Sequence, residues 1–410
     1  MSRRSVVGAV VLAAVIGTGA GCGGTSRSET VTSERGPLPG GGEHVHYRTL
    51  PDAIPIVRGD LRIGAVEGDP NLTFGDVRVI DAGADGTIYV LDYIAREIRA
   101  FGPDGTWLRT VARGGEGPGE ITRANGLVLI GDSLLWVQDH GSWNNLALSL
   151  DGTEVARVPM HVRAYGYMWE GAIDEAGRIW KESYQTDQEP GTRPEDGLHE
   201  VAARVHLVSF DPGTEARDSV FVGAFVGRTH VASFGSSTRY LQIPFEPRQH
   251  VVVDPGGSFW IVAGARYEIV RLDAAGDTTL IITADVPPPP VTDADRERFI
   301  EQLGGSSPAG LRGAEEALAV APEVRPAIAG LAVDDLSRLW VRRSGDAEQP
   351  QRRYDVFDRN GAFVMSVLLD FPTSEYLPIR VRHGQLYALS LDELEVPYIV
   401  RAPVPSAGDG

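Results

Sequence analysis

Residues 85–92 read DGTIYVLD, a tight turn followed by a short apolar strand with an aromatic residue at its centre. The same order of turn, apolar strand and central Tyr or Trp recurs along the 410-residue chain. The six aromatic markers are Tyr89, Trp136, Trp180, Trp260, Trp340 and Tyr387. Three intervals between markers span 44 to 47 residues. Repeats of about 40 to 50 residues made of strands and turns are typical of β-propellers. The pattern therefore predicts an all-β fold, a six-bladed β-propeller.

Two intervals between markers span 80 residues, nearly twice the repeat. Neither contains a further turn followed by an aromatic strand. The first has its extra length in a polar stretch at 184–197 and in a long connection at 228–248. The second contains two stretches with helical signals, 296–303 and 311–321, between prolines. We expect a short helical insertion at about residues 291–325, between the fourth and fifth blades.

The last repeat unit lacks its fourth strand. Only one strand fits after Tyr387, at 396–402. Residues 60–66, DLRIGAV, form a strand pattern ahead of the first full unit. Pairing of this strand with the last blade closes the ring and covers sheet edges that would otherwise promote aggregation. We therefore expect the propeller to span residues 58–402, followed by a disordered tail at 403–410.

The first 22 residues have the composition of a secretory signal. Two arginines precede an apolar run at 6–16, which is shorter than the roughly 20 residues of a membrane-spanning helix. The only cysteine, Cys22, ends the stretch Gly19-Ala20-Gly21-Cys22, which resembles the lipobox of bacterial lipoproteins. An ordinary signal that is removed without lipidation is the alternative. We expect residues 1–22 to be a signal peptide and Cys22 to carry a lipid.

Residues 23–57 are interpreted as a flexible tether. From Gly23 to about Gly42 they are mainly Gly, Ser, Thr, Glu and Pro, a composition that buries too little apolar surface to fold. Such a tether holds a folded body away from the membrane. Within it, His44 and His46 lie at strand spacing, which is a weak metal pattern because zinc sites use three or four protein ligands.

The charge of the chain disfavours several partners. The sequence has 38 Lys and Arg against 56 Asp and Glu, a formal net charge of −18. Such a surface repels phosphate backbones and anionic lipid headgroups. We expect no nucleic-acid partner, membrane contact only through the lipid anchor, and a monomer.

With the repeats laid out, the chain resembles the six-bladed β-propeller lipoproteins of bacteria, a group related to the NHL-repeat propellers. The stretches that carry the resemblance are Asp85–Asp92, Gly114–Glu120, Ile243–Phe245 with Pro247, and Tyr267–Val270. The resemblance implies an exported, membrane-tethered protein and no shared cofactor. The resemblance is specific for the fold but says little about activity.

Asp92 and Asp139 are the candidate metal ligands. Each follows its marker aromatic by three residues, at the end of a second strand. Carboxylates at the mouth of a propeller channel can hold calcium or another divalent metal. Capping of the adjacent turn is the alternative, because Asp is a common turn residue.

Five further residues form a candidate anion-binding group on an otherwise acidic body. Arg239, Tyr240 and Arg248 lie in the long connection, and Arg342 and Arg343 follow the fifth marker. Connections between blades lie on propeller faces, where loops contact ligands. Ion pairing with nearby Asp or Glu is the alternative for the arginines.

The sequence favours a binding or interaction module at the bacterial cell envelope, periplasmic or surface-facing, with an envelope protein or a small ligand as partner. No catalytic cluster stands out, and no cofactor is expected. The alternative is a metal-dependent hydrolase or lyase with its site at the channel mouth, holding calcium or another divalent metal.

Overall fold

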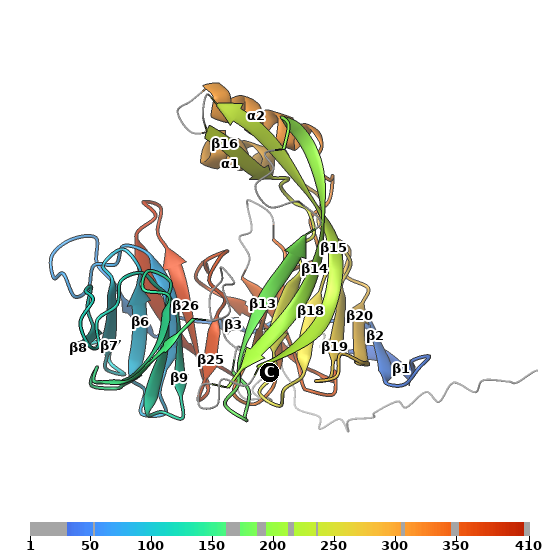
Figure 1. The fold of residues 1–410 in the computed structure, drawn as a ribbon. Coiled ribbons are helices and arrows are strands. Elements are labelled where there is room, and N and C mark those ends of the chain that lie inside the picture. Colours follow the sequence, from blue (N-terminus) through green and yellow to red (C-terminus); the bar gives the residue numbers. More distant parts are fainter. Residues whose placement is uncertain are drawn as a thin grey trace, which may run out of the picture.

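The computed structural model describes residues 31–51, 54–160, 173–186, 194–211, 217–234, 237–304, 308–345 and 352–405. The predicted signal peptide, Cys22 and the predicted tail from residue 406 onward lie outside the described residues. The described chain is mostly β, with strands gathered into small, largely antiparallel sheets (Figure 1). The prediction of a mostly β protein is therefore confirmed.

Six sheets follow one another along the chain, and we number them in that order. The first contains β5 (Val77–Ala82), β6 (Ile88–Asp92), β7 (Glu97–Phe101) and β8 (Trp107–Ala112). The second contains β9 (Ala124–Ile130), β10 (Leu134–Asp139), β11 (Asn144–Ser149) and β12 (Glu154–Pro159). The third contains β13 (Ile179–Thr186), β14 (Gly197–Phe210), β15 (Arg217–Phe234) and β16 (Ser237–Gln242).

The other three sheets each include strands from the N-terminal part of the chain. The fourth contains β17 (His250–Val253), β18 (Phe259–Val262), β19 (Glu268–Leu272) and β20 (Thr278–Ala284), with β2 (Glu43–Thr49) and β1 (Thr32–Pro37) added at its edge. The fifth contains β21 (Ile328–Val333), β22 (Leu339–Arg343), β23 (Arg353–Phe357), β24 (Phe363–Leu369) and β3 (Ile56–Val57). The sixth contains β25 (Arg380–Arg382), β26 (Gln385–Leu391), β27 (Pro397–Pro403) and β4 (Leu61–Ile63).

Each sheet shares a buried apolar cluster with the next one along the chain. Five such clusters join consecutive sheets, from the first and second to the fifth and sixth. A sixth cluster joins the last sheet to the first, with Tyr387 and Ile399 against Ile80 and Val90. Burial of these apolar faces between sheets is the main stabilising contribution of the fold.

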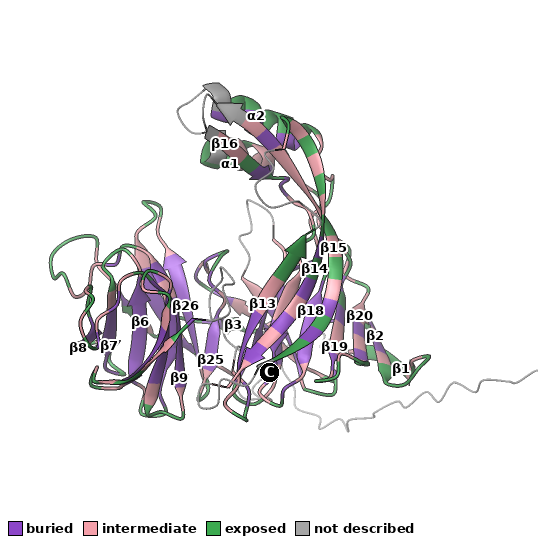
Figure 2. Cartoon of the chain, viewed as in Figure 1, coloured by how far each residue is buried: buried purple, intermediate pink, exposed green. Residues whose placement is uncertain are grey.

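The marker aromatics lie in these clusters, and all six are buried. Figure 2 shows long buried stretches along the strands of the sheets, such as β6 and β18. Three of the tryptophans also donate their indole N–H to an aspartate six residues earlier in the chain. The pairs are Trp180 with Asp174 at 2.9 Å, Trp260 with Asp254 at 3.5 Å, and Trp340 with Asp334 at 2.9 Å. The same aspartates accept backbone N–H groups of the turn between them and the tryptophan, so each one fixes both the turn and the ring.

The prediction of a flexible tether over residues 23–57 is wrong for its described part. Strand β2 pairs in parallel with β20, and β1 pairs with β2. Val45 and Tyr47 are buried in the cluster of the fourth and fifth sheets, while the alternating His44, His46 and Arg48 are half-buried or exposed. This alternation of apolar and polar residues is the physical reason that the segment is a strand, and composition alone does not reveal it.

Strand β4 lies beside the last strand of the chain. Leu61, Arg62 and Ile63 pair in antiparallel register with Arg401, Val400 and Ile399 of β27. The Arg401 guanidinium also forms an ion pair with Asp60 at 3.0 Å. The N-terminal strand thus takes the outer place in the sixth sheet, at the position expected from the sequence.

The third sheet extends well beyond the other five. Strands β14 and β15 are 14 and 18 residues long, and β16 pairs only with the distal half of β15. The predicted long connection at 228–248 is therefore wrong at 228–234 and 237–242, which are strand. Helices α1 (Asp293–Gly304) and α2 (Pro308–Ala319) lie within the predicted insertion at 291–325 and pack on this extension (Figure 1).

Candidate functional site

Two adjoining hollows lie between the fourth and fifth sheets and the base of the extension. Their volumes are about 320 Å³ and 570 Å³, and both are lined by Arg248, His250, Ala329, Arg342 and Glu375. We call this combined site the Arg248–Arg342 groove. Glu182 of β13 lines the smaller hollow, and Phe299 of α1 lines the larger one. Volumes of this size suit small-molecule ligands.

Arg342 is the most deeply placed cation of the groove, with 9% of its surface exposed. Its guanidinium donates to three backbone carbonyls, those of Ser374 at 2.8 Å, Ala329 at 2.9 Å and Glu375 at 3.2 Å. No carboxylate of the described residues lies within ion-pair distance of it. Carbonyl dipoles hold the side chain in place but leave its charge uncompensated, which favours an anion in the groove.

Arg248 and His250 lie beside Arg342 at the start of β17. Arg248 is exposed, and no described carboxylate lies within ion-pair distance of its guanidinium. Burial, together with the positive charges of Arg342 and Arg248, lowers the pKa of His250 to about 4. His250 is therefore neutral near pH 7, and the two arginines supply the positive charge of the groove.

Acidic side chains also line the groove. Burial raises the pKa of Glu182, against a hydrogen bond from the Tyr184 hydroxyl that favours its charged form. Glu375 is exposed at the rim of both hollows. The groove is therefore lined by two cations without an ion-pair partner among the described residues, together with carboxyl groups. Sequence reasoning missed Glu182 and Glu375, since neither lies in a repeat position that differs visibly from ordinary surface residues.

Of the five predicted ligand-binding residues, the structure brings Arg248 and Arg342 together. Arg343 projects elsewhere, because adjacent residues of a strand face opposite sides. It forms an ion pair with Asp355 at 2.6 Å, and Asp355 also accepts hydrogen bonds from Tyr267 and Ser366. This pairing is the structural alternative that the sequence left open for Arg343.

Arg239 and Tyr240 lie on β16, in the extension of the third sheet. Neither lines the two hollows of the groove. Tyr240 is 56% exposed on the surface of the strand. The structure therefore does not place these two residues with Arg248 and Arg342.

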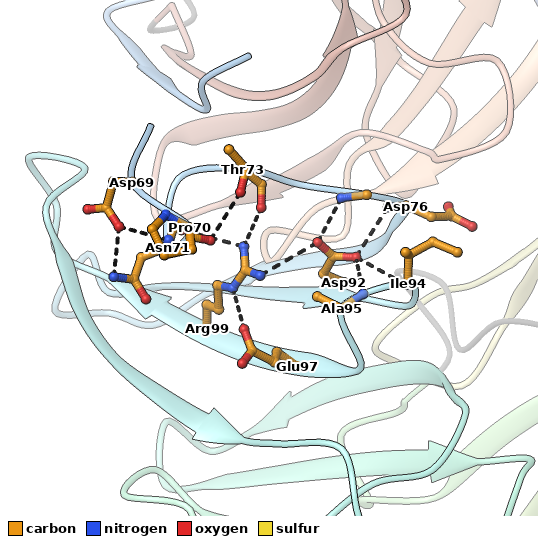
Figure 3. A network of polar contacts seen from close by, with 11 residues as sticks. Asp69, Pro70, Asn71, Thr73, Asp76, Asp92, Ile94, Ala95, Glu97 and Arg99 are labelled. Carbon is orange, nitrogen blue, oxygen red and sulfur yellow. Dashed lines mark hydrogen bonds and ion pairs between the residues drawn. The ribbon is translucent and has the colours of Figure 1, made fainter. Parts of the chain in front are cut away.

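Asp92 is fully buried and anchors two loops of the first sheet (Figure 3). One carboxylate oxygen accepts the backbone N–H groups of Ile94 and Ala95 at 3.1 Å each, in the turn after β6. The carboxylate also accepts the N–H groups of Gly75 at 2.9 Å and Asp76 at 3.2 Å, in the segment that leads into β5. The Arg99 guanidinium lies 3.9 Å away.

Asp139 does the same in the second sheet. It accepts the N–H groups of Thr122 at 2.9 Å, Arg123 at 2.7 Å and Gly141 at 3.1 Å, and the hydroxyl of Ser142 at 2.9 Å. Burial acts to raise the pKa of Asp139, but the hydrogen bonds from Thr122, Arg123 and Ser142 outweigh it and hold the pKa below its usual value.

Both carboxylates thus accept hydrogen bonds from backbone N–H groups of neighbouring loops. This arrangement corresponds to the turn-capping alternative. Within the described ranges, no group of three or more His, Cys, Asp or Glu side chains is arranged to hold a metal ion. His44 and His46, the weak metal pattern, both contact the hydroxyl of Thr283, at 2.8 and 2.9 Å. The metal-dependent hydrolase or lyase stays a prediction from sequence, without support from these residues.

Comparisons with known proteins give distant likenesses only. No protein-family model and no curated protein matches the chain. Among solved structures, a Bacteroides fragilis protein described as a "putative exported protein" shares 10% identity, with a TM-score of 0.44 over 86% of this chain and 100% of that one. Virginiamycin B lyase from Staphylococcus aureus shares 9% identity, with a TM-score of 0.39 over 84% of this chain and 99% of that one.

Regucalcin from Agrobacterium tumefaciens, a calcium-binding protein, shares 11% identity, with a TM-score of 0.35 over 86% of this chain and 98% of that one. All three TM-scores are below 0.5, so no activity or ligand of these proteins transfers to this chain. Neither helix in the described part of the chain has the length and apolar character needed to cross a bilayer.

Proposed function

We propose that this protein is an exported six-bladed β-propeller, anchored to the cell envelope through Cys22, that binds a small anionic ligand in the Arg248–Arg342 groove. The six sheets are its blades, and the pairing of β4 with β27 closes the ring. The lipid on Cys22 tethers the body to a membrane without a spanning helix. The extension of the third sheet and the two helices form a wall beside the ligand.

Two features support the closed ring. The buried clusters run from each sheet to the next and from the sixth back to the first. In addition, Asp81 of β5 connects three sheets. It accepts from the Arg380 guanidinium of β25 at 2.8 Å and from the Leu129 N–H of β9 at 2.9 Å. Burial acts to raise the pKa of Asp81, but Arg380 and Arg382 lower it overall.

The proposed binding role rests on one observation: Arg342 is buried and has no carboxylate partner among the described residues. A buried guanidinium without a carboxylate partner is costly, and binding of an anion offsets that cost. Arg248 adds a second uncompensated charge on the same lining. A cation pair in a concave site also concentrates anions locally, even on a protein whose net charge is −18.

Calorimetric titration of the mature chain with succinate, citrate and inorganic phosphate tests the proposal. We expect saturable binding of at least one anion, and at least a tenfold loss of affinity in Arg248→Gln, since a charge-assisted hydrogen bond contributes about 1.5 to 3 kcal/mol. Arg58→Gln is the matched control, because Arg58 is exposed and lies outside the groove. Equal affinity in Arg248→Gln and wild type contradicts the proposed site.

The anchor is tested separately in the producing cell. Wild-type protein is expected in the membrane fraction and the Cys22→Ser variant in the soluble fraction or retained as precursor. Identical fractionation of the two proteins contradicts lipid anchoring at Cys22.

A further inference from the structure

A further hollow of about 640 Å³ lies between the first and second sheets, formed by residues other than those of the groove. Its lining includes Arg78, Arg96 and Arg123, the aromatic residues Tyr93 and Trp143, and Glu116. We call it the Arg96–Arg123 pocket. Three arginines and one glutamate line this pocket, on a chain that is acidic overall.

Two of the three arginines have no ion-pair partner among the described residues. Arg78 is paired with Asp76, with its Nε 2.8 Å from the carboxylate. Arg96 and Arg123 are exposed, and no carboxylate of the described residues lies within ion-pair distance of either one. The nearby Glu120 carboxylate is turned into its own loop, where it accepts the Gly117 N–H at 2.7 Å. The pocket therefore has an excess of positive charge at its surface.

The loops that carry these residues are held in an unusual conformation. Arg96 has φ 55° and Trp143 has φ 56°, and each lies four residues after the buried aspartate that anchors its loop. The left-handed region is unfavourable for side chains of this size and persists only where the surroundings impose it. Asp92 imposes it on the first loop (Figure 3). Asp139 imposes it on the second loop, through the hydrogen bonds described above. They are positioning residues of the pocket.

Close contacts hold the Arg96 side chain and the Arg123 backbone. The Arg96 guanidinium lies across Gly114, where an added Cβ would be 3.0 Å from its Nε. Gly141 lies against the segment of Arg123, where an added Cβ would be 2.2 Å from the Thr122 hydroxyl. The Arg123 N–H is bound by Asp139 at 2.7 Å. A site whose loops are ordered before binding loses less conformational entropy when a ligand arrives.

Aromatic surface lies beside the charges. The Arg78 guanidinium stacks over the Tyr93 ring at 4.7 Å, and the Trp143 ring, 47% exposed, lies at 6.0 Å from the His140 ring. A half-exposed indole next to uncompensated guanidinium groups offers an apolar face to a ligand whose charged end is held by arginine.

We infer that the Arg96–Arg123 pocket binds a small organic anion, with its phosphate or carboxylate group between Arg96 and Arg123 and its ring against Trp143. This second site is independent of the Arg248–Arg342 groove. Its ligand class is defined by an oxyanion and a flat apolar body, whether the oxyanion is a phosphate or a carboxylate.

Calorimetric titration of the mature chain with phenyl phosphate, benzoate and inorganic phosphate tests this inference. We expect phenyl phosphate or benzoate to bind with a dissociation constant below about 1 mM. Arg96→Gln and Arg123→Gln should each weaken this binding at least tenfold. Trp143→Ala should weaken binding of the aromatic anion several-fold while leaving that of inorganic phosphate unchanged. The tighter of the two aromatic anions identifies the oxyanion that the pocket prefers.

Two controls separate this site from the groove and from misfolding. Arg248→Gln and Arg58→Gln should bind the aromatic anion as the wild type does, and all variants should keep the wild-type unfolding temperature. If Arg96→Gln unfolds, Arg123→Gln and Arg96→Lys still test the pocket. Absence of saturable binding by both aromatic anions overturns the inference. So does affinity that is unchanged in Arg123→Gln or lost in Arg248→Gln.

Discussion

Single buried polar residues carry much of the specificity of this fold. Asp174, Asp254 and Asp334 each fix a turn and a tryptophan, and Asp92 and Asp139 each join two loops. In every case an otherwise costly buried carboxylate is satisfied by several N–H donors. A sequence shows that these positions are Asp, but the number of donors that reach each one depends on the fold.

Lys181 is the only lysine in the chain, and it is buried in β13. Burial lowers the pKa of its amine to about 8. Between about pH 8 and 10.5 the folded chain therefore holds a neutral amine and the unfolded chain a charged one. The unfolded state binds more protons in this window, so the contribution of Lys181 to stability rises with pH there.

We predict that the ¹³Cε resonance of the single lysine titrates with a midpoint near pH 8 in the native protein and near 10.5 in denaturant. Lysine-specific labelling makes the assignment unambiguous, because the sequence contains no other lysine. A native midpoint near 10.5 would show that the amine is hydrated.

At the scale of elements, the extension of the third sheet and the helical insertion stabilise each other. Leu241 and Ile243 pack with Ala317 of α2. His230 of β15 lies 2.9 Å from the Glu316 carboxylate, and Arg228 donates to the Val320 carbonyl at 2.9 Å and to Glu246. These contacts connect α2 and the segment after it to β15, to β16 and to the segment that follows β16.

We predict that Arg228→Ala loosens the helices without unfolding the rest. Amide hydrogen exchange in 293–319 should become faster by at least tenfold, while exchange in the first and second sheets stays unchanged, since local opening is governed by local contacts. Arg312→Ala, an exposed position on α2, is the control. Uniform acceleration over the whole chain would contradict this local role.

At the scale of the whole molecule, the sequence predicted the repeated sheets better than the extended part of β15 and the strand β2. The aromatic markers recur because each repeat buries the same position between sheets, and this periodicity is visible in one sequence. The extended part of β15 was missed because it has no turn or marker, and β2 because a glycine-rich, polar composition surrounds Val45 and Tyr47.

The candidate site was predictable only in part, because it is formed by contacts between residues of different sheets. Arg248 and Arg342 meet because two neighbouring sheets place them on one lining. Arg343, one residue later, turns away with the alternation of the strand and pairs with Asp355. Contacts across sheets of this kind depend on the register and twist of distant strands, which a local pattern does not contain.

Ring closure by β4 and β27 is the central claim, and a disulfide across that pair tests it most directly. Arg62 and Val400 are direct partners in the antiparallel register, where facing Cβ atoms lie about 4.5 to 5.5 Å apart. Arg62→Cys with Val400→Cys, in a Cys22→Ser background, should form an intramolecular disulfide under mild oxidation and raise the unfolding temperature. Absence of that disulfide in the folded protein, with the pair remaining as free thiols, would contradict the closed ring.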